Sequence, residues 1–230
     1  MLVTIHQPNY MPWPGFFHKW LLADAFVVLD TVQYHKNEWQ NRNRIKTAQG
    51  AQWVTVPVKY RFPERINEVA IAGGPWARKQ VAAIEQAYAK AESFKDFWPM
   101  IRDVLNMDWS MLSPLNTALI RELGRMLGCT APLYLASEMQ TREEDPTQRL
   151  IALCRELGGD AYLSGREGRN YLHAKAFADA GLALWFQEVK PPEYPQLHGE
   201  FVPYLSVLDL LLNCGDDAAK IVQDMGGMAR

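Results

Sequence analysis

The sequence is poor in cysteine and contains no long hydrophobic run. Its three cysteines, Cys129, Cys154 and Cys214, lie far apart among 230 residues and form no Cys-x-x-Cys pair, so neither a disulfide framework nor a structural zinc site is expected. The first residues lack the basic and apolar regions of a signal peptide, and no stretch approaches the roughly 20 apolar residues of a membrane span. We therefore expect a cytoplasmic protein with reduced thiols and no membrane partner.

A strong excess of either charge is also absent. The formal net charge is -2, from 24 basic and 26 acidic residues, which gives no general footprint for nucleic acid or for an anionic membrane. The local basic residues Arg42, Arg44 and Lys46 leave nucleic-acid binding as a minor alternative, and the overall charge argues against it.

Several catalytic signatures are missing as well. The chain has no Gly-x-Ser-x-Gly elbow, no His-Glu-x-x-His helix, no Walker loop and no Gly-x-Gly-x-x-Gly fingerprint, so the enzyme classes that these motifs mark are not indicated. Metal binding would rest on scattered histidines and aspartates, and no metal ligand set is predicted.

The most informative stretch present runs from His6 to Lys19 and contains three prolines and a glycine. An apolar run at 2–5 precedes it, and an amphipathic segment at 16–25 and a second apolar run at 26–30 follow, which predicts a strand, a loop, a helix and a strand. The prolines restrict the loop backbone and lower the entropy cost of ordering its polar groups. Because ligands of open α/β sheets bind at the carboxyl ends of strands, we expect this loop to face a ligand.

The rest of the chain alternates between strand and helix patterns. Residues 52–58 read as a third strand, and residues 76–128 have helical periodicity throughout. Residues 131–230 follow a β-α-β-α-β rhythm. We therefore predict an α/β fold with a mostly parallel, doubly wound sheet, Rossmann-like or nucleotidyltransferase-like, and an inserted helical subdomain. In one compact domain, the predicted parts are an N-terminal α/β half (1–74), a helical insertion (75–130) and a C-terminal α/β half (131–230).

Two segments carry no regular pattern. Residues 31–47 are polar and lack a clean period, which predicts a loop that is either mobile or ordered by a ligand. Within it, Asn41-Arg42-Asn43 offers amide and guanidinium donors to a phosphate or carboxylate, and we expect it to act as a lid. The chain from Gly226 onward is predicted to be frayed.

Three residues are candidates for catalysis. His6 follows the first strand directly and could act as a base, a metal ligand or a donor to an oxyanion; a structural role is equally open. His18 lies with Lys19 in the first turn of the next helix, where backbone amides favour an anion. Asp30 ends the second strand and suits a ribose hydroxyl, an ammonium group or Mg²⁺, with turn capping as its structural alternative.

A second strand-end loop, Ser164-Gly165-Arg166-Glu167-Gly168-Arg169, repeats the design of the first. Small residues and arginines between a strand and a helix suit a phosphate or sugar hydroxyls. The pattern is weak alone and gains weight from the opening loop. The candidate substrate- and phosphate-binding residues are Gln7, Asn9, Tyr10, Lys19, Gln33, Asn41, Arg42, Asn43, Lys46, Ser164, Gly165, Arg169 and Tyr194.

These motifs together resemble one known family. They include His6-Gln7-Pro8-Asn9-Tyr10-x-Pro12-Trp13-x-Gly15-Phe16-Phe17-x-Lys19, Trp39-Gln40-Asn41-Arg42-Asn43 and Ser206-Val207-Leu208-Asp209-Leu210-Leu211. Over nearly its whole length, the chain resembles the WbqC family of bacterial proteins. The resemblance implies a setting in surface polysaccharide and O-antigen biosynthesis. It also implies a glycine-type aminoacyl or acyl transferase, or an ATP-dependent amide ligase, that acts on a nucleotide-linked amino sugar.

A more distant resemblance concerns the first helix. The order of strand, proline-glycine loop, helix and strand is similar to that of the nucleotidyltransferase and pantothenate synthetase group, whose His-x-Gly-His motif binds a nucleoside triphosphate. Here Phe16 follows Gly15, and His18 stands three residues after the glycine. Because the chain departs from that motif, ATP with Mg²⁺ is considered as a cofactor but is not assigned.

Two functions from different classes stay open. The first is a transferase or ligase that joins an activated acyl or aminoacyl group to an amino sugar. Lys19, Arg42 and Lys46 would hold phosphates, and His6 or His18 would assist proton loss from the attacking amine. The second is a non-catalytic module that binds a sugar nucleotide or a partner enzyme of a polysaccharide pathway. Both expect a small-molecule ligand, either a nucleotide sugar or an acyl donor.

Overall fold

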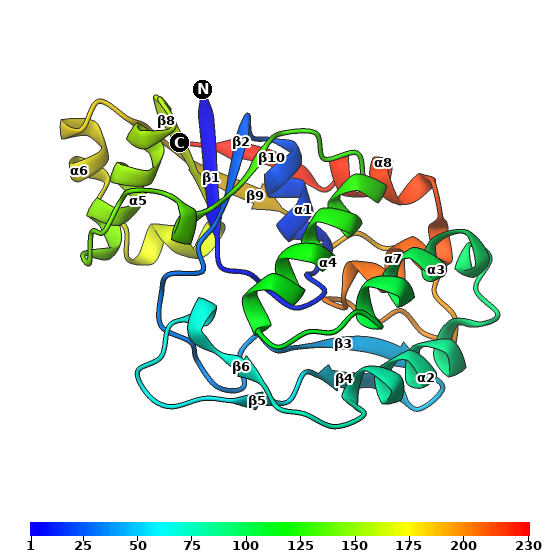
Figure 1. The fold of residues 1–230 in the computed structure, drawn as a ribbon. Helices are drawn as coiled ribbons and strands as arrows, with labels where there is room; N and C mark the ends of the chain where they lie inside the picture. Colours follow the sequence, from blue (N-terminus) through cyan, green and yellow to red (C-terminus); the bar gives the residue numbers. More distant parts are fainter.

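A six-stranded, mostly parallel sheet forms the centre of this computed structural model, which describes residues 1–230 (Figure 1). The strand order is β10-β9-β8-β1-β2-β7. All neighbours pair in parallel except β10, which runs antiparallel to β9. The strands are β1 (Leu2–His6), β2 (Ala25–Val28), β7 (Leu133–Leu135), β8 (Ala161–Ser164), β9 (Ala183–Val189) and β10 (Gly226–Ala229). The predicted mixed α/β class and mostly parallel sheet are confirmed.

Helices cover both faces of this sheet. Adjacent side chains of a strand point to opposite faces, and in β2 they enter two different cores. Val27 packs in the core beneath α5 (Pro146–Glu156) and α6 (Ala174–Asp179). Its neighbour Phe26 packs in the other core, beneath α1 (Pro14–Leu21). The connections after β1 and β8 therefore leave the sheet toward opposite faces (Figure 1).

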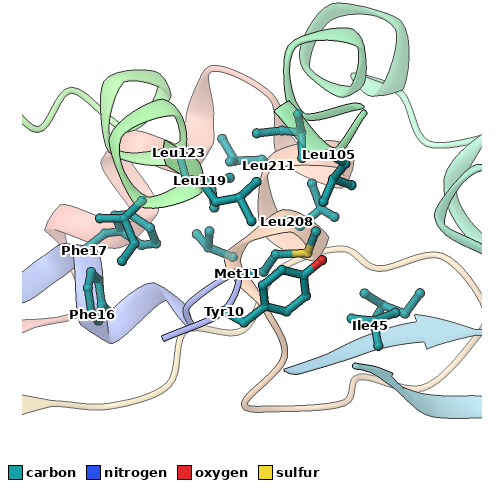
Figure 2. Close-up of a cluster of buried hydrophobic side chains, with 14 of the residues drawn as sticks. Tyr10, Met11, Phe16, Phe17, Ile45, Leu105, Leu119, Leu123, Leu208 and Leu211 are labelled. Carbon is teal, nitrogen blue, oxygen red and sulfur yellow. The ribbon is translucent and has the colours of Figure 1, made fainter. Parts of the chain in front are cut away.

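The larger core joins segments that lie far apart in the chain. Figure 2 shows Tyr10 and Met11 of the opening loop packed with Ile45, Leu119 and Leu208. The helices over 76–126 share this core with the opening loop and the last two helices; the division into three segments stays a prediction. These helices are α2 (Trp76–Tyr88), α3 (Phe94–Leu105), α4 (Leu112–Met126), α7 (Val207–Cys214) and α8 (Asp217–Gln223).

Two small hairpins lie outside the central sheet. One pairs β3 (Arg42–Thr47) with β4 (Gly50–Thr55), and the other pairs β5 (Val58–Lys59) with β6 (Ala70–Ile71). The prediction of an irregular loop is therefore wrong over 42–47. Asn43 and Lys46, two of the polar residues that suggested a loop, are buried and donate to backbone carbonyls of distant segments. The expected third strand exists, but it belongs to this hairpin rather than to the central sheet.

Short 3₁₀ turns and the C-terminus complete the fold. The turns cover Ile66–Glu68, Ala136–Glu138 and Arg166–Asn170. The predicted frayed tail is wrong, because Gly226 to Ala229 pair with Val189 to Phe186 of β9. Gly226 and Gly227 lower the strand propensity of this segment, and pairing with β9 compensates for that loss. The helix α6 begins only after the last of these 3₁₀ turns.

Candidate functional site

A cavity of about 940 Å³ opens at the carboxyl ends of three parallel strands. Its wall includes the final residues of these strands, namely His6 of β1, Ser164 of β8 and Val189 of β9. The chain turns toward one face of the sheet after β1 and toward the other after β8, and this divergence leaves a crevice between the two connections. The cavity therefore lies where open α/β sheets bind ligands.

The opening loop that forms part of this wall is held by side-chain amides from outside it. Asn43 Nδ2 donates to the carbonyl oxygens of Met11, at 2.7 Å, and Tyr10, at 3.2 Å. Asn116 Nδ2 donates to the Pro8 carbonyl at 2.9 Å. Met11 has a φ of 42°, in the left-handed region that non-glycine residues seldom adopt. The amide contacts thus stabilise a strained turn immediately before α1.

Aromatic rings contribute to the lining of the cavity. Trp13 precedes α1, and its ring covers Gly15 so closely that a Cβ atom there would lie 2.2 Å from a ring carbon. Only glycine permits this contact, which explains its place in the opening motif. The Trp13 and Tyr204 rings lie 6.1 Å apart, and both line the cavity with Tyr171. Rings of this kind can stack on a base or sugar.

His6 presents an acceptor nitrogen at the end of β1. Its Nδ1 atom lies 2.9 Å from the Gln7 carbonyl oxygen, and because a carbonyl only accepts, Nδ1 carries the proton and Nε2 keeps its lone pair. The ring also packs on the edge of Phe16, with centroids 4.7 Å apart. Burial, followed by the charge of Lys19, lowers the His6 pKa to about 3. The imidazole is therefore neutral at physiological pH.

Lys19 places an unpaired ammonium group in the same wall. The residue is 3% exposed, and its Nζ atom donates to the Ile5 carbonyl at 2.9 Å. No carboxylate forms an ion pair with it. Burial lowers the Lys19 pKa to about 7. A buried amine with free donors beside a cavity is suited to receive an anion, which would favour its charged form.

Three arginines add positive charge to the cavity. Arg65, Arg149 and Arg166 line it, against the carboxylates of Glu144 and Glu167. Arg149 is held in place by bonds from its guanidinium to the backbone carbonyls of Glu143 and Glu144, both at 2.7 Å. Arg166 belongs to the second strand-end loop, whose sequence suits a phosphate or sugar hydroxyls. Arg65 and Arg149 carry no local signal, because they come from a loop and a helix that only the fold brings here.

Six of the predicted site residues line this cavity: His6, Gln7, Lys19, Gln33, Ser164 and Gly165. Ser164 is 1% exposed, and its Oγ atom donates to the Gly165 carbonyl at 3.1 Å. The 3₁₀ turn that follows packs closely against Ser164, since a Cβ atom on Gly168 would lie 2.0 Å from Ser164 Oγ. The two strand-end loops singled out in the sequence therefore meet in one cavity.

His18 and Asp30 do not line this cavity. His18 is buried, and its Nδ1 atom receives a bond from Gln187 Nε2 at 2.9 Å; the two histidines considered as proton acceptors thus do not share the cavity. Asp30 accepts bonds from the Ser137 amide at 2.9 Å, the Ser137 hydroxyl at 2.7 Å and the Ser113 hydroxyl at 3.3 Å. These contacts tie the end of β2 to the start of α4 and to the turn after β7.

The remaining predicted residues also lie elsewhere, and most use their polar groups within the chain. Lys46 Nζ donates to the carbonyls of Gly199, at 3.1 Å, and Glu200, at 2.5 Å. The Arg42 guanidinium lies 4.2 Å from the Trp53 ring centroid. Asn41-Arg42-Asn43 is thus part of a hairpin rather than a free lid. The residues outside this cavity are Asn9, Tyr10, His18, Asp30, Asn41, Arg42, Asn43, Lys46, Arg169 and Tyr194.

Two further properties of the whole chain bear on its chemistry. Nowhere do three or more His, Cys, Asp or Glu side chains gather in an arrangement that could hold a metal ion. None of the helices combines the length and the apolar character needed to cross a bilayer.

Comparison with known proteins gives one family and one relative. Residues 7–221 match the family model described as the WbqC-like protein family. An uncharacterized protein of Mycobacterium tuberculosis, Rv1507c, is 37% identical over 220 residues, which cover 94% of this chain and 95% of the relative. No solved structure matches the chain.

Proposed function

The chain belongs to the WbqC-like protein family, and from this premise we propose that it attaches an acyl or aminoacyl group to an amino sugar carried on a nucleotide. The observation that carries the proposal is the lining of the cavity, where Lys19, Arg65, Arg149 and Arg166 outnumber the two carboxylates and occur together with aromatic rings. Guanidinium groups match phosphate oxygens in pairs. This reaction would serve surface polysaccharide assembly, O-antigen included, in the cytoplasm.

The strand order supports a nucleotide as the ligand. Numbered along the chain, the five parallel strands β1, β2, β7, β8 and β9 lie in the order five-four-one-two-three across the sheet. This order supports a doubly wound, Rossmann-like arrangement, in which a nucleotide binds where the strand order reverses, between the first and fourth strands. In this chain that point lies between β1 and β8, where the cavity opens. Its volume is also within the range of ligand sites, about 300–1,000 Å³.

The proposed chemistry is amide formation at the sugar amine. The amine nitrogen attacks the carbonyl carbon of an activated acyl donor, either a thioester or an acyl-adenylate. The new C–N bond forms while the C–S or C–O bond breaks, and the nitrogen loses a proton. His6 Nε2 would accept a hydrogen bond from the amine and orient its lone pair. Because the His6 pKa is about 3, its imidazole is a weak base and would not keep the proton. The proton would therefore pass on to water in the open cavity.

Ligand binding tests the first half of this proposal. Thermal unfolding is measured with UDP, UDP- and dTDP-linked amino sugars, ATP and coenzyme A, since a ligand at 100 times its dissociation constant stabilises by about 2.7 kcal/mol. We expect the amino-sugar nucleotides to raise Tm. Arg149→Gln should weaken this effect, whereas Arg78→Gln, at an exposed position of α2 outside the cavity, should not. No stabilisation by any of these nucleotides would overturn the proposal.

Turnover tests the second half. The protein is incubated with an amino-sugar nucleotide that it binds and with acyl-coenzyme A or with ATP plus a free amino acid, and the amide product is sought by mass spectrometry. We expect product with one donor class and its strong reduction in His6→Ala. Tight binding without product from either donor class would favour the non-catalytic module instead.

A further inference from the structure

A second hollow adjoins the main cavity on the other side of His6. Its volume is about 380 Å³, and it shares His6, Gln7 and His35 with the main cavity. Because these three residues border both spaces, the hollow lies directly beside the main cavity. The remaining lining residues of the hollow are Asn9, Glu38, Trp39 and Gln40.

The border between the two spaces is a built structure. Gln40 Nε2 donates to Gln7 Oε1 at 2.7 Å, and Gln40 Oε1 accepts from the His35 amide at 2.9 Å. Asn116 Nδ2 in turn donates to the Gln40 carbonyl at 2.7 Å. Gln40 is itself 2% exposed. This network fixes the loop over 35–40 against the opening loop, so the hollow has a defined shape without a ligand.

Trp39 supplies an aromatic surface in the hollow. Its carbonyl accepts a bond from the Tyr10 amide at 2.9 Å, which fixes its backbone to the opening loop. Its ring lies 5.4 Å from that of Trp53, which is itself covered by the Arg42 guanidinium at 4.2 Å. Trp39 nevertheless remains 41% exposed. A large ring that is held by a neighbouring ring and still exposed to solvent is suited to pack on the C–H face of a sugar.

Polar groups beside Trp39 are available for hydroxyls. Asn9 is 8% exposed and lines the hollow, and its amide forms no hydrogen bond within the chain. The side-chain amide atoms of Asn9 keep contact with solvent, so a ligand hydroxyl can take the place of water there. Glu38 adds an exposed carboxylate that forms no ion pair. Amides and carboxylates that flank an aromatic ring are the groups that bind a polyhydroxylated ring.

We propose that this hollow is the subsite for the sugar ring, with Trp39 as its stacking platform and Asn9 and Glu38 as its hydroxyl partners. This assignment rests on the proposed function, because the main cavity then holds the nucleotide and the sugar extends past His6. It deepens that function by naming the residues that distinguish a sugar nucleotide from a free nucleotide. It also brings the sugar ring next to His6, where the amine would react.

The test compares two ligands and two variants by calorimetry. Trp39→Ala should weaken binding of a UDP-linked amino sugar about tenfold or more, while UDP binding stays unchanged. The control is Tyr134→Ala on β7, because Tyr134 is 39% exposed, close to the value for Trp39, and lies outside both spaces; it should affect neither ligand. Equal weakening of UDP and the sugar nucleotide, or no weakening of either, would overturn the subsite.

A second measurement separates this subsite from the nucleotide site. If the wild-type protein bound no nucleotide, the proposed function would fail, and the hollow is then tested with methyl glucosaminide alone by tryptophan fluorescence. We expect a saturable spectral change that is absent in Trp39→Ala. Matching melting curves of variant and wild type confirm that both are folded. The absence of any change in the wild-type protein would overturn the subsite independently of the nucleotide.

Discussion

The ammonium nitrogen of Lys19 lies 2.9 Å from the carbonyl oxygen of Ile5, one residue before His6. This bond brings a cation from the first helix to the end of the first strand, beneath the cavity. Burial without a carboxylate partner lowers the Lys19 pKa to about 7, so its charge can respond to whatever occupies the site. The charge of Lys19 therefore affects both ligand binding and stability.

Anion binding should be coupled to proton uptake by Lys19. In the free protein at pH 8, Lys19 is mostly neutral because its pKa is about 7. A phosphate nearby favours the charged form and raises that pKa, so binding should take up about one proton at pH 8. Calorimetry of UDP binding in two buffers of different ionisation enthalpy measures this number. Lys19→Met should abolish the uptake, and equal heats in the two buffers for the wild type would contradict the prediction.

Lys19 should also make stability depend on pH. Its pKa is about 7 in the folded protein and about 10.4 when unfolded, so between these values the unfolded state binds more protons and stability rises with pH. Lys19→Met removes this penalty together with one hydrogen bond. We expect Tm of Lys19→Met to exceed that of the wild type at pH 7, by a difference that shrinks toward pH 10. A difference that is constant over this range would show that Lys19 does not carry the dependence.

Asn43 should be a major determinant of stability. Its amide donates to the Met11 and Tyr10 carbonyls, and Asn43→Ala would leave both acceptors buried without a partner. We expect a loss of about 2–3 kcal/mol and a fall in Tm of roughly 5–10 °C. Gln49→Ala, in the exposed turn of the same hairpin, should stay within about 0.5 kcal/mol. Urea denaturation gives both values, and similar losses for the two variants would refute the role of Asn43.

Gly15 should be irreplaceable because of Trp13. Gly15→Ala places a methyl group against the Trp13 ring, which must then move away from the cavity. We expect lower Tm and weaker UDP binding, and partial recovery of Tm in the double variant with Trp13→Ala. The control is Gly73→Ala, where an added Cβ atom meets nothing within 4 Å. Equal effects of the two alanine substitutions on Tm would show that the contact with Trp13 is not limiting.

How far the sequence predicts this fold depends on where each residue finds its partners. The central strands are recognisable because their apolar runs are buried on both faces, and the two strand-end loops stand directly after them. β3 is not recognisable, because Asn43 and Lys46 are satisfied by carbonyls of the opening loop and of residues 199–200. These partners are distant in the sequence, so the local sequence pattern does not indicate them. The polar residues of the hairpin therefore look like those of a loop.

The same reasoning applies to the cavity. His6 and Ser164 are predictable, because the carboxyl ends of neighbouring parallel strands meet at one edge of a sheet. Arg65 and Arg149 are not, since they reach the cavity from the loop before β6 and from α5 only in the folded chain. His18 shows the converse: the predicted first-turn position is wrong, because α1 begins at Pro14 and His18 lies with Lys19 in its last turn, and the His18 side chain turns to Gln187. Helix position alone does not state which face a side chain occupies.

Asp30 should act on stability rather than on ligand binding. Its carboxylate is 2% exposed and accepts three bonds, two from Ser137 and one from Ser113, and it lies outside the main cavity. In Asp30→Asn the amide nitrogen would face groups that need an acceptor, so at least one bond is lost and about 1–3 kcal/mol with it. Ser137→Ala, which removes the hydroxyl donor but leaves the backbone bond, should cost less. Below the melting transition, calorimetry should give the same UDP affinity for both variants as for the wild type. A large loss of affinity in Asp30→Asn, with Tm unchanged, would instead place this carboxylate in the ligand site.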